Sequence, residues 1–126
     1  MIRFTVYGTP RTKKTHNRVF MIKGRPRVLP SKAWVDWCAK AVIEFPDTSA
    51  WTAGLPLPDH PYNVCAHFYR DANRGDAVGY YQGLADLLEK RGIISNDKWL
   101  VGWDGSRLLK DKDNPRVEIT LTPAGP

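Results

Sequence analysis

The stretch from Tyr62 to Gly92, YNVCAHFYRDANRGDAVGYYQGLADLLEKRG, carries the clearest signals of fold in this chain. Residues 62–69 alternate apolar and polar side chains, which predicts a half-buried strand. A polar turn over 70–75 then leads to Asp76. This aspartate can cap a helix that we expect from about Ala77 to Arg91, stopping at the glycine. A strand followed directly by a helix therefore forms the centre of the predicted fold.

Three more strands and a second helix are predicted outside this stretch. Ile2–Tyr7 and Val117–Thr122 alternate in the strand manner, and residues 99–103 are typical of a short strand. Ser31 can cap a helix that carries an apolar stripe at helical spacing. The stripe consists of Trp34, Trp37, Cys38, Ala41, Val42 and Phe45. We expect this helix to end just before Pro46.

The order of these elements indicates an α+β domain. Strands do not alternate strictly with helices, so we expect a mixed β-sheet of about four strands with two main helices packed on one face. With 126 residues the chain has room for one core, and residues 1–126 are interpreted as a single domain. Residues 47–61 hold three prolines and are expected to form a connecting loop.

The positive charge of the chain is concentrated near its N-terminus. Nineteen Lys and Arg residues against thirteen Asp and Glu residues give a formal net charge of +6, which favours polyanionic partners. No acidic residue precedes Asp36. Seven basic residues crowd positions 11–27, namely Arg11, Lys13, Lys14, Arg18, Lys23, Arg25 and Arg27. We expect a basic hairpin or loop that contacts phosphates; a solvated charged loop is the alternative.

Cysteine and histidine usage argues against a zinc site. Cys38 and Cys65 lie far apart, and no histidine stands near either at the spacing that structural zinc sites use. Both thiols are expected to be small core side chains in a reduced, cytoplasmic protein. No apolar run is long enough for a membrane span, so no membrane partner is expected.

Two aspartates stand where phosphodiester chemistry can use them. Asp76 lies where the central strand gives way to the helix, and Asp97 lies in the loop after that helix. Enzymes that cut phosphodiesters with Mg²⁺ need carboxylate oxygens on rigid elements. The simpler interpretation makes Asp76 only a helix cap, Asp97 only a loop residue, and Asp86 part of a solvated helix face.

The whole chain resembles the RusA family of Holliday-junction resolvases. The likeness runs in order through the turn Gly8-Thr9-Pro10, the basic stretch with Lys13, Lys14 and Asn17, the helix start Ser31-Lys32-Ala33-Trp34, and the segment from Tyr69 to Trp99. The resemblance implies a small dimeric α+β endodeoxyribonuclease of DNA recombination and repair. Such an enzyme cuts four-way branched DNA by paired symmetric nicks, with Mg²⁺ or Mn²⁺ as cofactor.

The family motif also fixes a register on this chain. Asp86-Leu87-Leu88 takes the mid-helix place and Asn96-Asp97 the closing place, so Asp76 falls on the first acid of the motif's acidic pair. The resemblance thus implies that Asp76 and Asp97 hold the metal and act in catalysis. Four positions depart from the motif: Val78 replaces the second acid, Gly79 the Asn, Gln82 the catalytic Lys, and Asn96 the first closing acid. Asp71 is the nearest candidate for a third catalytic carboxylate.

The spacing of these aspartates raises a geometric question. A helix of about fifteen residues is ~22 Å long, so Asp76 before it and Asp97 after it should lie far apart. Either the helix is shorter and the loop folds back, or two subunits pack antiparallel and each Asp97 approaches the partner's Asp76. The second arrangement suits a twofold-symmetric junction, and on this ground we predict a homodimer.

The DNA-binding surface is expected on the basic stretch and on the turn before the second helix. Its predicted residues are Lys13, Lys14, Asn17, Arg18, Lys23, Arg25, Arg27 and Arg74. Contacts from such residues to phosphates depend on salt and carry little sequence information. Two rival functions remain open: a catalytically weak or inactive RusA-like DNA-binding protein, and a nuclease for flaps or other branches.

Overall fold

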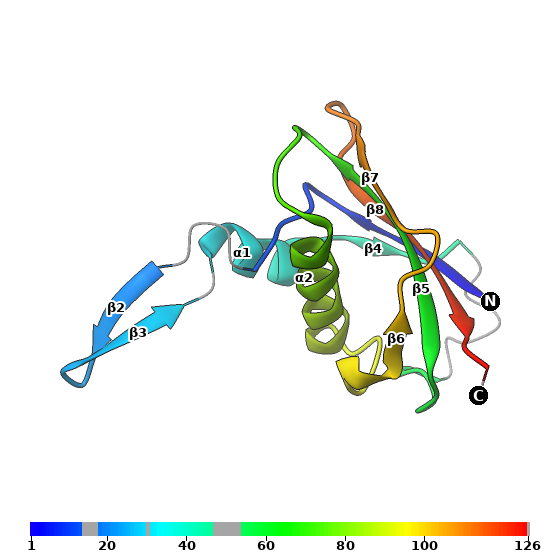
Figure 1. Cartoon of the computed structure of the whole chain (residues 1–126), viewed down its shortest axis with the longest axis horizontal. Helices are drawn as coiled ribbons and strands as arrows, with labels where there is room; N and C mark the ends of the chain where they lie inside the picture. The colour runs from blue at the N-terminus through cyan, green and yellow to red at the C-terminus, as the bar shows by residue number, and fades with distance from the viewer. Residues whose placement is uncertain (14–17, 30, 47–53, 126) are drawn as a thin grey trace.

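A mixed β-sheet forms the body of the protein, and both helices lie on one side of it (Figure 1). The computed structural model describes residues 1–13, 18–29, 31–46 and 54–125. The sheet order is β4-β1-β8-β5-β6, and β7 also pairs with β5. Its strands are β1 (Ile2–Tyr7), β4 (Ile43–Glu44), β5 (Tyr62–Arg70), β6 (Leu100–Gly102), β7 (Arg107–Lys110) and β8 (Arg116–Pro123). The predicted α+β class is confirmed, with six strands in the sheet rather than about four.

Alternation along the three central strands creates the core. β8 pairs antiparallel with both β1 and β5, whereas β5 runs parallel to β6 and β7. Every second side chain of the central strands is buried against the helices, and the intervening side chains face the other side of the sheet. The buried apolar residues of these strands are Phe4, Val6, Tyr62, Val64, Ala66, Phe68, Val117, Ile119 and Leu121.

The second helix, α2 (Ala77–Lys90), supplies most of the helical core. The buried residues of α2 are Tyr80, Gly83, Leu84, Ala85, Leu87 and Leu88. A short 3₁₀ helix, η1 (Asp97–Trp99), follows α2 in the chain. The predicted bounds of this helix and its Asp76 cap are confirmed. Gly83 is buried because the N-terminal segment packs over its face of the helix, with the backbone oxygen of Arg11 closest to it.

The first helix, α1 (Lys32–Lys40), begins at the expected Ser31 cap but ends earlier than the sequence predicts. Its apolar stripe continues past the helix because β4 packs against the same core in an extended conformation. The Val42 carbonyl accepts a hydrogen bond from the Tyr7 amide at 2.8 Å, as β4 pairs with β1. Branched side chains at 42 and 43 favour this extended backbone over another helical turn.

The outer strand beside β5 is split into β6 and β7 by a turn. Two polar side chains bond across the break. The side-chain amide of Asn63 exchanges two hydrogen bonds with the backbone of Asp104, at 3.2 and 3.0 Å. The buried Ser106 hydroxyl accepts from the Ala66 amide at 3.0 Å and donates to the Val64 carbonyl at 3.1 Å. Because β7 lacks clear alternation, the sequence did not predict it.

A two-stranded hairpin projects away from the sheet and the helices (Figure 1). It consists of β2 (Arg18–Ile22) and β3 (Arg25–Leu29), and we call it the arm. Its turn residues Lys23 and Gly24 both have positive φ angles, 52° and 75°, which is the two-residue geometry that matches strand twist. The sequence left a hairpin and a loop open for this region, and the structure has the hairpin.

The two cysteines lie in different surroundings. Cys38 is buried, and burial raises the pKa of its thiol to about 11, as befits a core residue. The expectation for Cys65 is wrong, because it lies half-buried on the sheet face away from the helices, with Sγ 3.8 Å from Nε2 of His67. In the part of the chain described, no helix has the length and apolar character to cross a membrane.

Candidate nucleic-acid interface and carboxylate site

The turn between β5 and α2 is organised by the buried Arg70. Its guanidinium donates to the Leu109 carbonyl at 3.0 Å and to the Arg74 carbonyl at 3.1 Å. The Tyr80 hydroxyl donates to the same Arg74 carbonyl at 2.8 Å. A Cβ on Gly75, whose φ is +75°, would lie 2.9 Å from the Tyr80 ring. The turn is therefore held rigidly against both the sheet and α2.

The two aspartates of this turn already have partners within the chain. Both carboxylate oxygens of Asp71 accept hydrogen bonds from Nη2 of Arg74, each at 2.7 Å. Asp76 caps α2, with Oδ1 accepting from the Gly79 amide at 2.8 Å. The capping role considered for Asp76 is therefore present, and its exposed side chain remains accessible to solvent.

The N-terminal segment after β1 packs closely on one face of α2. A Cβ on Gly83 would lie 2.6 Å from the backbone oxygen of Arg11, and a Cβ on Gly79 would lie 3.1 Å from the Thr12 side chain. The indole of Trp34 in α1 donates to the Gly83 carbonyl at 3.1 Å. Gly83 thus allows close contact with the backbone of this segment, and Gly79 allows close contact with its Thr12 side chain.

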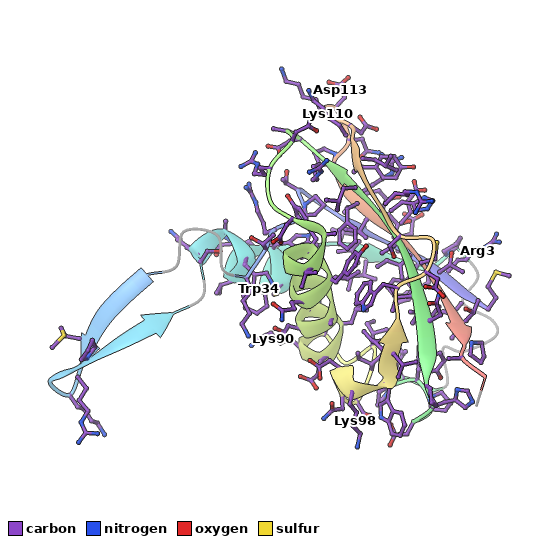
Figure 2. All side chains as sticks on the ribbon, viewed as in Figure 1. Arg3, Trp34, Lys90, Lys98, Lys110 and Asp113 are labelled. Carbon is purple, nitrogen blue, oxygen red and sulfur yellow. The ribbon has the colours of Figure 1, made fainter. Side chains whose placement is uncertain are left out.

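Cations surround the same face of α2. The ammonium of Lys13 lies 3.0 Å from Oδ2 of Asp86, so this aspartate is paired. Lys13 and Lys90 also lie 5.2 and 5.8 Å from the ring centre of Trp34 (Figure 2). Asp86, which the simpler interpretation placed on a solvated helix face, therefore lies at a contact between α2, the basic segment and α1.

The N-terminal end of α2 is electropositive. Burial raises the pKa of Tyr80, and nearby guanidinium groups act against that shift. These groups belong to Arg70, Arg74 and Arg11. A helix N-terminus adds further positive potential beside the capping carboxylate of Asp76.

The C-terminal end of α2 carries the other predicted aspartate. Asp97 is exposed in η1, and its amide donates to Oε1 of Glu89 at 3.2 Å. Lys98, which follows it, lies beyond this end of α2 (Figure 2). Asn96 caps η1 through its side chain, with Oδ1 accepting from the Lys98 amide at 2.9 Å.

The two ends of α2 are too far apart for one ion. Fourteen helical residues span ~21 Å, with Asp76 before the first and Asp97 beyond the last. The option of a shorter helix with a folded-back loop is wrong, because α2 runs its full predicted course. Among the described His, Cys, Asp and Glu residues, no three gather closely enough to hold a metal ion. Asp76 and Asp97 of one chain therefore cannot bind the same ion.

The predicted DNA-binding residues divide among three places. Lys23 and Arg25 are exposed at the tip of the arm, whereas Lys13 lies beside Asp86 of α2 and Arg74 lies in the turn before α2. Arg18 and Arg27 belong to the strands of the arm. Lys14 and Asn17 lie outside the described residues.

Sequence reasoning missed two residues that shape the site. Arg70 continues the buried alternation of β5, and an arginine at a core-facing position is a signal of a structural network. Glu89 contacts the η1 backbone across eight residues of sequence, and no spacing rule indicates such a contact. Comparison with protein-family models and with curated proteins gives no match. The likeness to RusA proteins therefore remains a resemblance at the positions quoted above.

Proposed function

We propose that this protein binds branched DNA and acts as a RusA-like, homodimeric endodeoxyribonuclease that resolves four-way junctions with Mg²⁺ or Mn²⁺. The observation that carries the DNA-binding part is the projecting basic arm, in a chain whose formal net charge is +6. Its exposed cations, Lys23 and Arg25, can contact phosphates without loss of any fold contact described above. Such contacts suit recognition of branch shape rather than of sequence.

The nuclease part of the proposal rests on the motif order and on the exposure of two carboxylates. Asp76 and Asp97 are both exposed, one at each end of α2. Antiparallel packing of two copies along this helix would place each Asp76 near the partner's Asp97, at two sites related by a twofold axis. A divalent ion bound there would supply charge and an activated water for hydrolysis.

The second candidate is a RusA-like DNA-binding protein without catalytic activity. The observation in its favour is that the acids near the N-terminal end of α2 already have partners in the fold. Asp76 caps the helix, Asp71 pairs with Arg74, and Val78, at the place of the family's second acid, is 64% exposed but cannot bind a metal. On this view the same surfaces bind the junction without cutting it.

A cleavage assay with complementation separates the two candidates. Wild type, Asp76→Asn and Asp97→Asn are incubated with a synthetic four-way junction and either metal. Asn caps helices about as well as Asp, so Asp76→Asn should remove activity without unfolding α2. Asp113→Asn, an exposed acid at the far tip of the sheet (Figure 2), is the matched control and should cut like wild type.

Mixing the two inactive variants tests the composite site. A mixed dimer keeps one site with both aspartates, so nicking should return at about a quarter of the wild-type number of sites. Recovery supports the nuclease and its shared site. If wild type binds the junction but does not cut it with either metal, the non-catalytic candidate is correct. If wild type does not bind junctions at all, both candidates are wrong.

A further inference from the structure

The tip of the arm joins an apolar pair to two cations. Met21 and Pro26 are direct partners in the β2–β3 register, and both side chains are exposed, Met21 by 69%. Lys23 and Arg25 lie within two residues of this pair and are also exposed. An apolar pair placed at the end of a projecting ribbon contributes nothing to the core, so its position requires another explanation.

The local backbone makes this tip well suited to present apolar surface. In a two-residue hairpin the residues flanking the turn, here Ile22 and Arg25, form the hydrogen-bonded pair. Met21 and Pro26 are the next pair, which exchanges no backbone hydrogen bonds, so Pro26 costs the ribbon nothing there. The rigid proline ring and the adaptable methionine side chain form one apolar end.

We infer that this apolar pair is a wedge that enters the base stack of DNA at a branch point or at another deformable step. The inference rests on the proposed DNA-binding function and specifies how the arm recognises its partner. Proteins that bend or open DNA insert side chains such as Met and Pro between base steps, while neighbouring cations contact the phosphates. At a four-way junction the stack is already interrupted, which lowers the cost of insertion.

The dimensions of the arm agree with this role. Five residues of strand span ~16 Å, which exceeds the ~8.5 Å depth of the major groove. A two-stranded ribbon is also narrow enough to enter a DNA groove. The combination of apolar residues and cations at the tip of the arm favours DNA over a protein partner. The centres of protein interfaces are depleted in lysine, whereas a DNA wedge requires cations beside its apolar end.

The test uses a four-way junction that carries 2-aminopurine, whose emission rises on unstacking, either at the branch point or in the middle of one arm. Full-length wild type and the double variant Met21→Ser/Pro26→Thr are titrated without divalent metal. Wild type should raise emission from the branch probe only. The variant should lose this rise and about tenfold of its junction affinity. Its affinity for plain duplex and its salt dependence should stay unchanged, because every charge is retained.

The control variant in this titration is Val101→Ser. It removes a valine of β6 that is 59% exposed, and it should behave as wild type. The wedge is overturned, and DNA binding retained, if the double variant opens and binds the junction as wild type does. It is also overturned if the double variant is monomeric where wild type is dimeric, because the arm would then contact a second copy. If wild type binds no DNA, the wedge and the proposed function fail together.

Discussion

The arm and the turn before α2 use charged residues in opposite ways. At the tip of the arm, Lys23 and Arg25 are exposed and extend from a ribbon that projects from the body. In the turn, Arg70 is buried and Asp76 serves as a helix cap. The difference indicates that charge in the turn stabilises the fold, whereas charge on the arm remains available for a partner. Substitutions in the two regions should therefore affect different measurements.

The largest loss of stability is expected where the N-terminal segment contacts α2. Gly83→Ala should lower the free energy of unfolding by about 2 kcal/mol, because the new methyl lies 2.6 Å from the backbone oxygen of Arg11 and something must move. Urea denaturation followed by circular dichroism measures this loss. Gly125→Ala is the control, since nothing lies within 4 Å of its Cβ. Equal stabilities for the two variants would contradict the close packing.

A slightly smaller loss is expected from the turn itself. Arg70→Met removes the donors that hold the Leu109 and Arg74 carbonyls, and should cost up to about 2 kcal/mol of unfolding free energy. Limited proteolysis should also cut the variant faster within residues 71–75. Arg3→Met, an exposed arginine of β1 (Figure 2), should leave both measurements unchanged. An Arg70 variant as stable and as resistant as wild type would remove the contrast between turn and arm.

The arm should show the reverse behaviour. Lys23→Gln/Arg25→Gln should leave the unfolding free energy unchanged, while the slope of log affinity for DNA against log salt falls by about 1.8, as for two lost phosphate contacts. Fluorescence anisotropy with labelled junction and duplex measures the slope. Lys110→Gln/Lys112→Gln removes the same charge from the end of β7 and the turn after it, and should change the slope less; Lys110 lies at the far end of the sheet (Figure 2). Equal changes in slope for the two double variants would mean that DNA binding depends on net charge alone and not on the position of the arm.

Much of the fold follows from local patterns in the sequence. β1, β5, β8 and α2 were predicted within a residue or two, because each has clear alternation or clear caps. The end of α1 was predicted wrongly, since helical spacing and strand alternation both place apolar residues at 41–45. The pairing of β4 with β1 decides between the two patterns, and that pairing joins segments more than thirty residues apart.

The candidate site was less accessible to prediction than the fold. The helix-capping role of Asp76 was expected, because it depends on neighbouring residues alone. The pairing of Lys13 with Asp86 and the burial of Gly83 depend on how a distant segment crosses α2. Periodicity describes one element at a time and does not predict such crossings. Whether Asp76 meets Asp97 depends on how two copies pack together, and patterns within one chain do not predict that packing.

The broken outer strand has a consequence for how copies of this protein can associate. An edge strand invites another sheet to join it when it offers a long, uninterrupted row of free amides and carbonyls. One sheet edge here is the two-residue β4, and the other is divided between the three-residue β6 and the four-residue β7. Neither edge is a good template for sheet extension. Association of two copies by extension of this sheet is therefore disfavoured at both of its edges.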